Sequence, residues 1–354
     1  MPTINELLKE TVTRGASDLH LSAGDPPRIR IDGDLTTVGE VLDAEQVATL
    51  IFELCTAEQR QRFGTEHDLD FSHAIEGIGR FRVNLFMQGR GPGAVLRTIP
   101  TEIPSIESLQ LPPLLTRLCE RERGLVLVTG PTGSGKSTTL AAMVDLINQT
   151  WDAHILTVED PIEFVHRSKR CLVNQREVGM HTASFATALR SALREDPDVI
   201  LVGEMRDLET ISLALTAAET GHLVFGTLHT SSAAKTMDRI IDVFPAGQQN
   251  QIRAMLAESL EAVVAQQLLR KKEGGRVAAC EILIGVAAVR NLIREGKLHQ
   301  IPSMMQTGQQ AGMQTFDMAV ADLVKRGVIE PPAPPARAAA PAGGAAMLAQ
   351  PRTS

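Results

Sequence analysis

The sequence predicts a doubly wound α/β domain preceded by a smaller α+β domain, and three observations lead to this prediction. From Gly124 onward, apolar strand-like runs alternate with helical stretches, which is typical of a parallel sheet with helical crossovers. The first 99 residues instead mix amphipathic helices with strands of period two. Between the two segments, three prolines fall within residues 101–113 and indicate a linker.

In the first domain, the patterns predict helices over 3–12 and 44–55 and strands over 28–35, 79–86 and 94–100. The first helix begins with Thr3 and Glu6 at capping-box spacing, and the pair Asp32-Gly33 is a hairpin turn signal. The 79–86 strand has one apolar face and one polar face. The polar face carries Arg80, Arg82 and Asn84.

In the second domain, the strand-like runs are 125–129, 154–160, 198–204 and 222–229. The helical stretches between and after them are 182–193, 208–219, 249–269 and 286–297. In the last of these, helical spacing predicts that Val289, Leu292 and Ile293 pack inward and that Arg290, Asn291 and Arg294 face outward. We therefore divide the chain into a first domain (1–99), a linker or hinge (100–123), a second domain (124–330) and a tail (331–354). The tail is rich in alanine and proline without apolar periodicity, so we expect it to be disordered.

The run GPTGSGKST, residues 130–138, fits the phosphate-loop pattern G-x-x-x-x-G-K-[ST]. Its glycines let backbone N–H groups point at phosphate oxygens. Lys136 would place a cation near the β- and γ-phosphates, and Ser137 would offer a hydroxyl to Mg²⁺. A flexible glycine turn is the alternative, but the motif lies between a buried-type strand and a helix, as a phosphate loop requires. We therefore predict binding of a nucleoside triphosphate by Gly130, Pro131, Thr132, Gly133, Ser134, Gly135, Lys136, Ser137 and Thr138.

Carboxylates at two other strand ends are candidates for the chemistry of hydrolysis. Glu204 ends the apolar strand DVILVGE, where ligands sit in such sheets. Glu159, Asp160 and Glu163 cluster around Pro161 after the strand HILTV, where they would repel one another unless a cation or water lay among them. A surface carboxylate and a solvated acidic loop are the alternatives.

Histidines and arginines complete the set of candidates. His222 and His229 flank the strand LVFGTL and could donate to a phosphate, although either could equally be a satisfied core histidine. Arg80 and Arg82 could neutralise charge that develops during phosphoryl transfer, and a solvated or ion-paired strand face is the alternative.

Taken together, these motifs resemble the secretion and pilus ATPase superfamily, and within it the PilT family of type IV pilus retraction ATPases. The resemblance covers residues 1–330. It rests on ASDLHLSAG with PPRIRIDG, on the phosphate loop, and on EDPIE, LVGEMRD, TGHLVFGTLHT and VRNLIREGKLHQI, which resemble the family's Asp box, Walker B segment, His box and C-terminal retraction signature. It implies a RecA-like P-loop NTPase domain preceded by a PAS-like domain.

The resemblance also implies roles for particular residues. Glu204 would be the catalytic carboxylate, Glu159 and Glu163 would occupy the Asp-box acidic positions, and Glu163 would be the second catalytic carboxylate. Further implied roles are nucleotide sensing by His222 and His229, and contact with nucleotide by Arg80, Arg82 and Arg97.

By the same resemblance, the function is that of a motor that couples Mg²⁺-dependent ATP hydrolysis to pilus retraction and twitching motility. The expected partners are further copies in a hexameric ring, a platform protein of the inner membrane and a paralogous retraction ATPase. A related pilus-assembly or type II secretion ATPase is one alternative. An accessory subunit that binds nucleotide but hydrolyses little is another.

Composition restricts the remaining possibilities. The formal net charge of −7 argues against a nucleic-acid-coating protein. Four scattered cysteines, none in a CxxC pair, fit a reducing compartment and predict no zinc site. The N-terminus lacks a signal-peptide layout, and no apolar run approaches the ~18 residues of a membrane span. We expect a cytoplasmic protein that associates with the inner membrane through the pilus machine.

Overall fold

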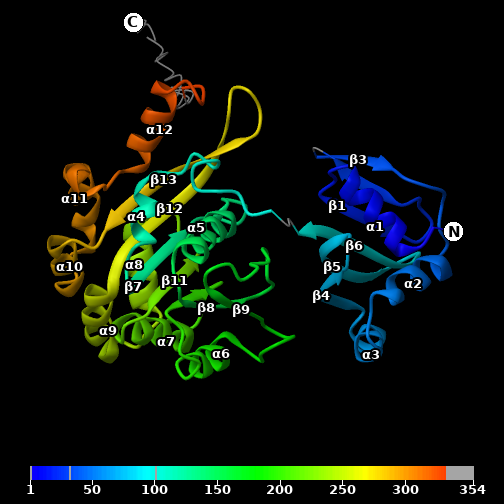
Figure 1. The fold of residues 1–354 in the computed structure, drawn as a ribbon, viewed down its shortest axis with the longest axis horizontal. Coiled ribbons are helices and arrows are strands. Elements are labelled where there is room, and N and C mark those ends of the chain that lie inside the picture. The colour runs from blue at the N-terminus through cyan, green and yellow to red at the C-terminus, as the bar shows by residue number, and fades with distance from the viewer. Residues whose placement is uncertain (1, 32, 100–101, 332–354) are drawn as a thin grey trace, which may run out of the picture.

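The computed structural model describes residues 2–31, 33–99 and 102–331 (Figure 1). Buried apolar side chains form one large cluster before residue 100 and another after residue 105. The predicted disorder of the tail falls almost wholly on residues outside the described ranges. No helix within those ranges is long and apolar enough to cross a membrane.

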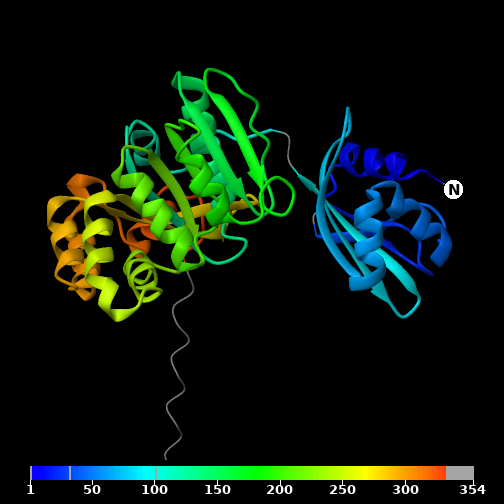
Figure 2. The ribbon, with the colours of Figure 1, turned by 90° about the horizontal axis from the view of Figure 1, so that it is seen from below.

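The N-terminal domain is an antiparallel sheet with helices on one face. Within the described residues, the sheet has six strands in the order β3-β2-β1-β6-β5-β4. Its strands are β1 (Asp18–Ser22), β2 (Arg28–Ile31), β3 (Asp34–Thr37), β4 (Asp68–Ile75), β5 (Gly79–Gln88) and β6 (Gly91–Ile99). Its helices are α1 (Ile4–Thr13), α2 (Ala44–Glu53) and α3 (Ala57–Glu66). In Figure 2 the helices lie on the face of the sheet that is turned away from the second domain.

Local sequence signals account for these elements. The predicted capping box starts α1, where Thr3 accepts from the Glu6 amide and Glu6 accepts from the Thr3 amide. Phe81, Val83 and Leu85 of β5 are fully buried under the helices, as the alternation predicted. The predicted hairpin joins Ile31 to Asp34, while Asp32 of its turn lies outside the described residues.

The second domain is a mixed sheet in the order β13-β12-β7-β11-β10-β8-β9, seven strands within the described residues. All neighbours are parallel except β12 and β13. The strands are β7 (Gly124–Thr129), β8 (His154–Glu159), β9 (Leu172–Glu177), β10 (Val199–Val202), β11 (Leu223–Leu228), β12 (Leu260–Arg270) and β13 (Arg276–Ile284). All six residues of β7 are buried, and α5 and α7 both pack against this strand.

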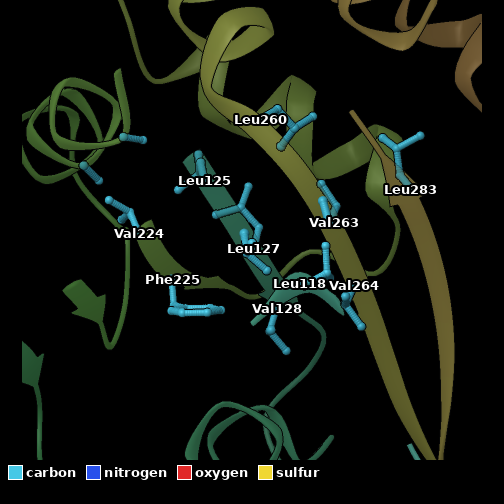
Figure 3. Close-up of a cluster of buried hydrophobic side chains, with 14 of the residues drawn as sticks. Leu118, Leu125, Leu127, Val128, Val224, Phe225, Leu260, Val263, Val264 and Leu283 are labelled. Atoms are coloured by element: carbon cyan, nitrogen blue, oxygen red, sulfur yellow. The ribbon is translucent and has the colours of Figure 1, made fainter. Parts of the chain in front are cut away.

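Helices surround this sheet and continue beyond it. They are α4 (Leu114–Leu118), α5 (Lys136–Thr150), α6 (Phe185–Ala192), α7 (Leu208–Glu219), α8 (Ala233–Asp242), α9 (Ala246–Ser259), α10 (Ala287–Arg294), α11 (Ile301–Thr307) and α12 (Phe316–Lys325), with short 3₁₀ turns η1 (Leu298–Gln300) and η2 (Gln309–Ala311). The α/β prediction is confirmed. Figure 3 shows side chains of β7, β11 and β12 meeting in the aliphatic core, beside Leu118 of α4.

Two differences from the sequence-based expectation stand out. The stretch 249–269, predicted as one helix, is α9 followed by β12, so its second half was wrong. Val263 and Val264 favour a strand, and the backbone of β12 pairs with β7 on one side and β13 on the other. In addition, Ile106, Leu111 and Leu115, within the predicted linker, are buried in the core of the second domain. The segment outside both cores is therefore shorter than the 100–123 range predicted.

Candidate functional site

The phosphate loop follows β7 and leads directly into α5, the predicted context. Gly130 and Gly135 have φ values of +143° and +87°, which other residues rarely adopt. A Cβ atom on Gly130 would lie 2.3 Å from the carbonyl oxygen of Gln266, so no side chain fits there. The loop is therefore held tightly at the amino end of a helix, where backbone N–H groups favour an anion.

A neighbouring strand supports the loop through one buried side chain that the sequence did not single out. Gln266 of β12 is 2% exposed. Its Nε2 atom donates to the carbonyl oxygen of Ser134 at 2.7 Å, and its Oε1 atom accepts from Thr139 Oγ1 at 2.8 Å. Gln266 thus joins the phosphate loop and the first turn of α5 to β12.

A cavity of about 450 Å³ opens above the phosphate loop. Carboxylates predicted from two separate strand ends line it together with the loop. The predicted candidate residues that line it are Arg97, Thr132, Gly133, Gly135, Lys136, Ser137, Thr138, Glu159, Asp160, Glu163, Glu204 and His229. The parallel strands β7, β8, β10 and β11 all end at this edge of the sheet, which explains the convergence.

Lys136 lies in the electrostatic field of the carboxylates. Its Nζ atom donates to the carbonyl oxygens of Gly130 at 2.9 Å and Pro131 at 3.2 Å. Burial lowers the pKa of Lys136, while the carboxylates of Glu204 and Glu163 act in the opposite direction. The ammonium group and both predicted catalytic carboxylates therefore share one electrostatic environment.

Glu204 is held by two cationic or polar partners. Its Oε1 atom lies 2.9 Å from His229 Nε2 and is also bonded to Arg206. The Glu204 carboxylate raises the pKa of Arg206. Sequence reasoning missed Arg206, although it follows the strand end by two residues.

Glu159 is set apart from the other carboxylates by its surroundings. Burial raises the pKa of Glu159, although Thr157 and Gln175 donate to its Oε1 atom at 2.6 and 3.2 Å. A carboxyl group in such a place favours its neutral form, because burial disfavours charge. The structure therefore gives Glu159 and Glu204 different partners and surroundings.

Outside the phosphate loop, three predicted residues lie away from the cavity lining. Arg80 pairs with Glu177 at 2.8 Å, and Arg82 lies 3.8 Å from Asp70 beside a second cavity that also includes Asp160. His222 precedes β11 and contacts the carbonyl oxygen of Ala217 through Nδ1 at 2.9 Å. At a rise of about 3.3 Å per residue, it is roughly 20 Å from His229 along the strand.

Other residues line the main cavity without having been predicted, namely Phe185, Thr227, Leu268 and Arg276. Arg276 begins β13, a strand that the sequence patterns did not reveal. Its position beside the phosphate loop depends on the pairing of Arg276 with Arg270 at the end of the β12–β13 hairpin. No local motif could have indicated it.

The oxygen donors around the loop fit a hard divalent cation. The Ser137 hydroxyl and the carboxylates of Glu159, Glu163 and Glu204 line the same space, and Mg²⁺ prefers oxygen ligands together with phosphate. In the described part of the chain, no group of three or more His, Cys, Asp or Glu side chains could hold a metal ion by itself. The donor set thus suits a cation that arrives with a nucleotide.

Comparisons with known proteins place these features in context. The family described as "Type II/IV secretion system protein" matches residues 1–306. The type IV pilus retraction ATPase PilT of Pseudomonas aeruginosa is 60% identical over 327 residues, covering 92% of this chain and 95% of the relative. A twitching motility protein of Neisseria gonorrhoeae is 59% identical and covers 88% and 84% of the two chains. A crystal structure of the pilus retraction motor PilT with bound ADP superposes with a TM-score of 0.88 at 51% identity, covering 93% and 95%.

Proposed function

The chain belongs to the type II/IV secretion system protein family, and within it we propose that the protein is the ATPase motor that drives type IV pilus retraction and twitching motility. It binds ATP and hydrolyses it to ADP and phosphate. The observation that carries this function is the convergence of Lys136 with Glu163 and Glu204 on one cavity, in a chain that is 60% identical to a pilus retraction ATPase over 327 residues.

Residues 130–138 bind the phosphates, with Lys136 near the β- and γ-phosphates and Ser137 on Mg²⁺. When bound, Mg²⁺ would neutralise phosphate charge and orient the oxygens. Glu204 polarises the attacking water, and its contact with His229 supports a role for that histidine in sensing nucleotide. Glu163 is the second catalytic carboxylate, and Glu159, by its burial, shapes the site. Arg97 reaches the cavity within its own chain.

Arg80, Arg82 and His222 act, in this proposal, across a boundary. Because their positions lie outside the cavity of the same chain, they contact nucleotide only if a domain moves or if another copy supplies them. A ring of copies, expected to be a hexamer, provides such boundaries. The ring works at the cytoplasmic side of the inner membrane, on a platform protein and alongside a paralogous retraction ATPase.

The biochemical test is Lys136→Ala. Loss of the cation should weaken ATP binding and abolish turnover, because the phosphate charge loses its main protein partner. The measurement is steady-state phosphate release together with ATP affinity. A variant that hydrolyses ATP at the parent rate would refute the assignment of the phosphate loop.

The cellular test separates retraction from the assembly alternative. A strain that lacks the protein should accumulate surface pili and lose twitching, because fibres would still be built but not withdrawn. Absence of pili would instead assign the protein to assembly. Expression of Lys136→Ala in that strain should fail to restore twitching, which links the phenotype to hydrolysis.

A further inference from the structure

A buried carboxylate joins the two domains beside the catalytic cavity. Glu177, the last residue of β9, is 3% exposed. Its Oε1 atom accepts from Ser72 Oγ at 2.8 Å. Its Oε2 atom accepts from Arg80 Nη2 at 2.8 Å and from the backbone amide of Ile162 at 3.1 Å. We call this set of four residues the Glu177 junction.

One side of the junction belongs to the N-terminal domain. Ser72 lies on β4 and Arg80 on β5, and Arg80 Nη2 also donates to Ser72 Oγ at 2.8 Å. The Arg80 side chain is 19% exposed, so this pair is largely shielded from water. Hydrogen bonds between charged, shielded groups are stronger than those between neutral groups. The N-terminal domain therefore presents a preassembled donor pair to Glu177.

The other side of the junction belongs to the loop of residues 160–163, which follows β8 and ends at Glu163. Ile162 immediately precedes Glu163, which lines the cavity. Glu177 also lies opposite Glu159 in the β8–β9 pairing, and the Val178 amide donates to the Glu159 carbonyl oxygen at 2.9 Å. Glu177 and its neighbour Val178 therefore hold the backbone of this loop, through Ile162 and Glu159 respectively, while Glu177 itself does not line the cavity.

We propose that Glu177 is a positioning residue that couples the orientation of the N-terminal domain to the position of Glu163. Movement of Ser72 and Arg80 away from Glu177 would remove two of the three donors that the described residues provide to its carboxylate, one of them its ion-pair partner, and the loss of such charged hydrogen bonds is costly. Movement of the N-terminal domain therefore changes the hydrogen bonding of Glu177, and through the Ile162 amide it shifts the loop that carries Glu163. This inference rests on the proposed function, because it takes Glu163 as a catalytic carboxylate.

The test uses the full chain with Glu177→Gln and Ser72→Ala. Glutamine keeps the shape and an acceptor for the Ile162 amide but loses the charge that faces Arg80. A displacement of about 1 Å at a catalytic group can cost about a hundredfold in rate, so we expect Glu177→Gln to lower kcat by about tenfold or more. ADP affinity should stay close to the parent value, because the phosphate loop is untouched. Ser72→Ala should act in the same direction but less strongly.

Hydrogen–deuterium exchange reports on the coupling itself. Among the described residues, the Ser72 side chain forms hydrogen bonds with Glu177, Met180 and Arg80 and with no residue of 160–164. Ser72→Ala should nevertheless accelerate exchange in a peptide that covers residues 160–164. A role confined to interdomain stability would lower the melting temperature without this local effect. Unchanged exchange at 160–164 in both variants would overturn the proposal.

Glu195→Gln is the matched control. Glu195 pairs with Arg176, the neighbour of Glu177 on β9, at 3.0 Å. This pair is partly buried but joins only parts of the second domain. Its loss should leave kcat near the parent value. If Glu177→Gln and Glu195→Gln lower the melting temperature alike and leave turnover per folded molecule unchanged, Glu177 has only a structural role and the proposal is wrong.

Lys136→Ala and Glu204→Gln, assayed in parallel, distinguish failure of this inference from failure of the proposed function. If both are inactive while Glu177→Gln keeps the parent kcat, only the coupling is refuted. If both hydrolyse ATP like the parent, the proposed function falls and the coupling falls with it.

Discussion

At the scale of single residues, Glu204 combines access to the cavity with fixed partners. Its side chain is 19% exposed and is held by His229 and Arg206. A carboxylate that is already oriented by its hydrogen-bond partners can polarise a water molecule without a further change of conformation. Arg206 is only two residues away in sequence, whereas His229 reaches Glu204 because β10 and β11 are neighbouring strands.

Glu204→Gln should lower kcat by at least about a hundredfold, because a general base typically contributes about 10²–10⁴-fold. Nucleotide affinity should be retained, since the change falls on the step to the transition state. Steady-state hydrolysis, ATP affinity and a melting curve on one preparation test this. Glu209→Gln, which breaks an exposed pair with Arg190, is the control. Near-normal turnover with normal melting would move the catalytic role to Glu163.

A second residue-scale prediction concerns pH. Burial lowers the pKa of His166 to about 4, while the charge of Asp145 acts to raise this pKa and that of Lys169 to lower it further. The ring atom Nδ1 is buried without a hydrogen-bond partner among the described residues. An unfolded histidine protonates near pH 6.5. Between about pH 6.5 and 4 the unfolded chain therefore binds more protons, so stability falls as the pH falls through that window.

The expected loss from His166 by pH 4 is about 3 kcal/mol, since each pKa unit corresponds to about 1.36 kcal/mol. His166→Leu should flatten the decline in unfolding free energy between pH 7 and 4.5, as measured by chemical denaturation. His299→Leu, at an exposed site, should keep the parent slope. Equal slopes for the parent and His166→Leu would show that other groups cause the decline.

At the scale of elements, α10 corrects one expectation from the sequence. Val289, Leu292 and Ile293 pack inward as predicted, and Asn291 and Arg294 are exposed. The expectation that Arg290 also faces outward is wrong. Its guanidinium donates to the carbonyl oxygen of Gly285 at 2.6 Å, to Glu261 Oε1 at 2.7 Å and to the carbonyl oxygen of Glu258. Arg290 thus provides hydrogen bonds to a carbonyl oxygen and a carboxylate at the junction of α9 and β12. The helical periodicity of the sequence does not predict these contacts.

Substitutions on the two faces of α10 should therefore act differently. Arg290→Ala leaves partly buried carbonyl groups without their donor and leaves Glu261 with only Arg121 as an ionic partner among the described residues. We expect it to cost about 2 kcal/mol of stability. Arg294→Ala should melt like the parent and hydrolyse ATP normally. It should impair retraction in cells if, as we propose, the exposed face of α10 transmits force or contacts a partner. Thermal melts, turnover and twitching zones, at matched protein levels, measure both. Normal twitching by Arg294→Ala would show that the exposed face of α10 is only solvated and has no role in retraction.

At the scale of the whole molecule, some of the arginines that we expected at the nucleotide do not line the cavity of their own chain. Arg97 reaches the cavity, but Arg82 faces Asp70 and a separate cavity. If Arg82 acts on the nucleotide of a neighbouring copy, one defective copy can be complemented by another. Mixing two inactive variants in solution and measuring ATP hydrolysis tests this possibility directly.

Arg82→Ala and Glu204→Gln should each be nearly inactive alone and regain part of the turnover when mixed. In a mixed ring, some boundaries combine an intact Arg82 from one copy with an intact Glu204 from the other. A mixture of Lys136→Ala with Glu204→Gln is the control, because both changes fall in the same chain's cavity and no boundary is restored. Failure of the first mixture to exceed the control would place the action of Arg82 within its own chain.

The sequence by itself determined the features that depend on near neighbours. The phosphate loop is a contiguous run between a strand and a helix, and the capping box of α1 and the alternation of β5 are equally local. Their physics is set within a few residues, so patterns predict them. The strand ends that carry Glu163 and Glu204 could also be anticipated, because parallel strands finish at one edge.

Only the tertiary structure decided which distant residues support these motifs. Gln266 holds Ser134 across 132 residues of sequence, and Ser72 meets Glu177 across 105. The second half of 249–269 became a strand because β7 and β13 offered backbone partners on both sides. Such contacts depend on how the sheets assemble, since burial and unpaired backbone groups outweigh local propensity.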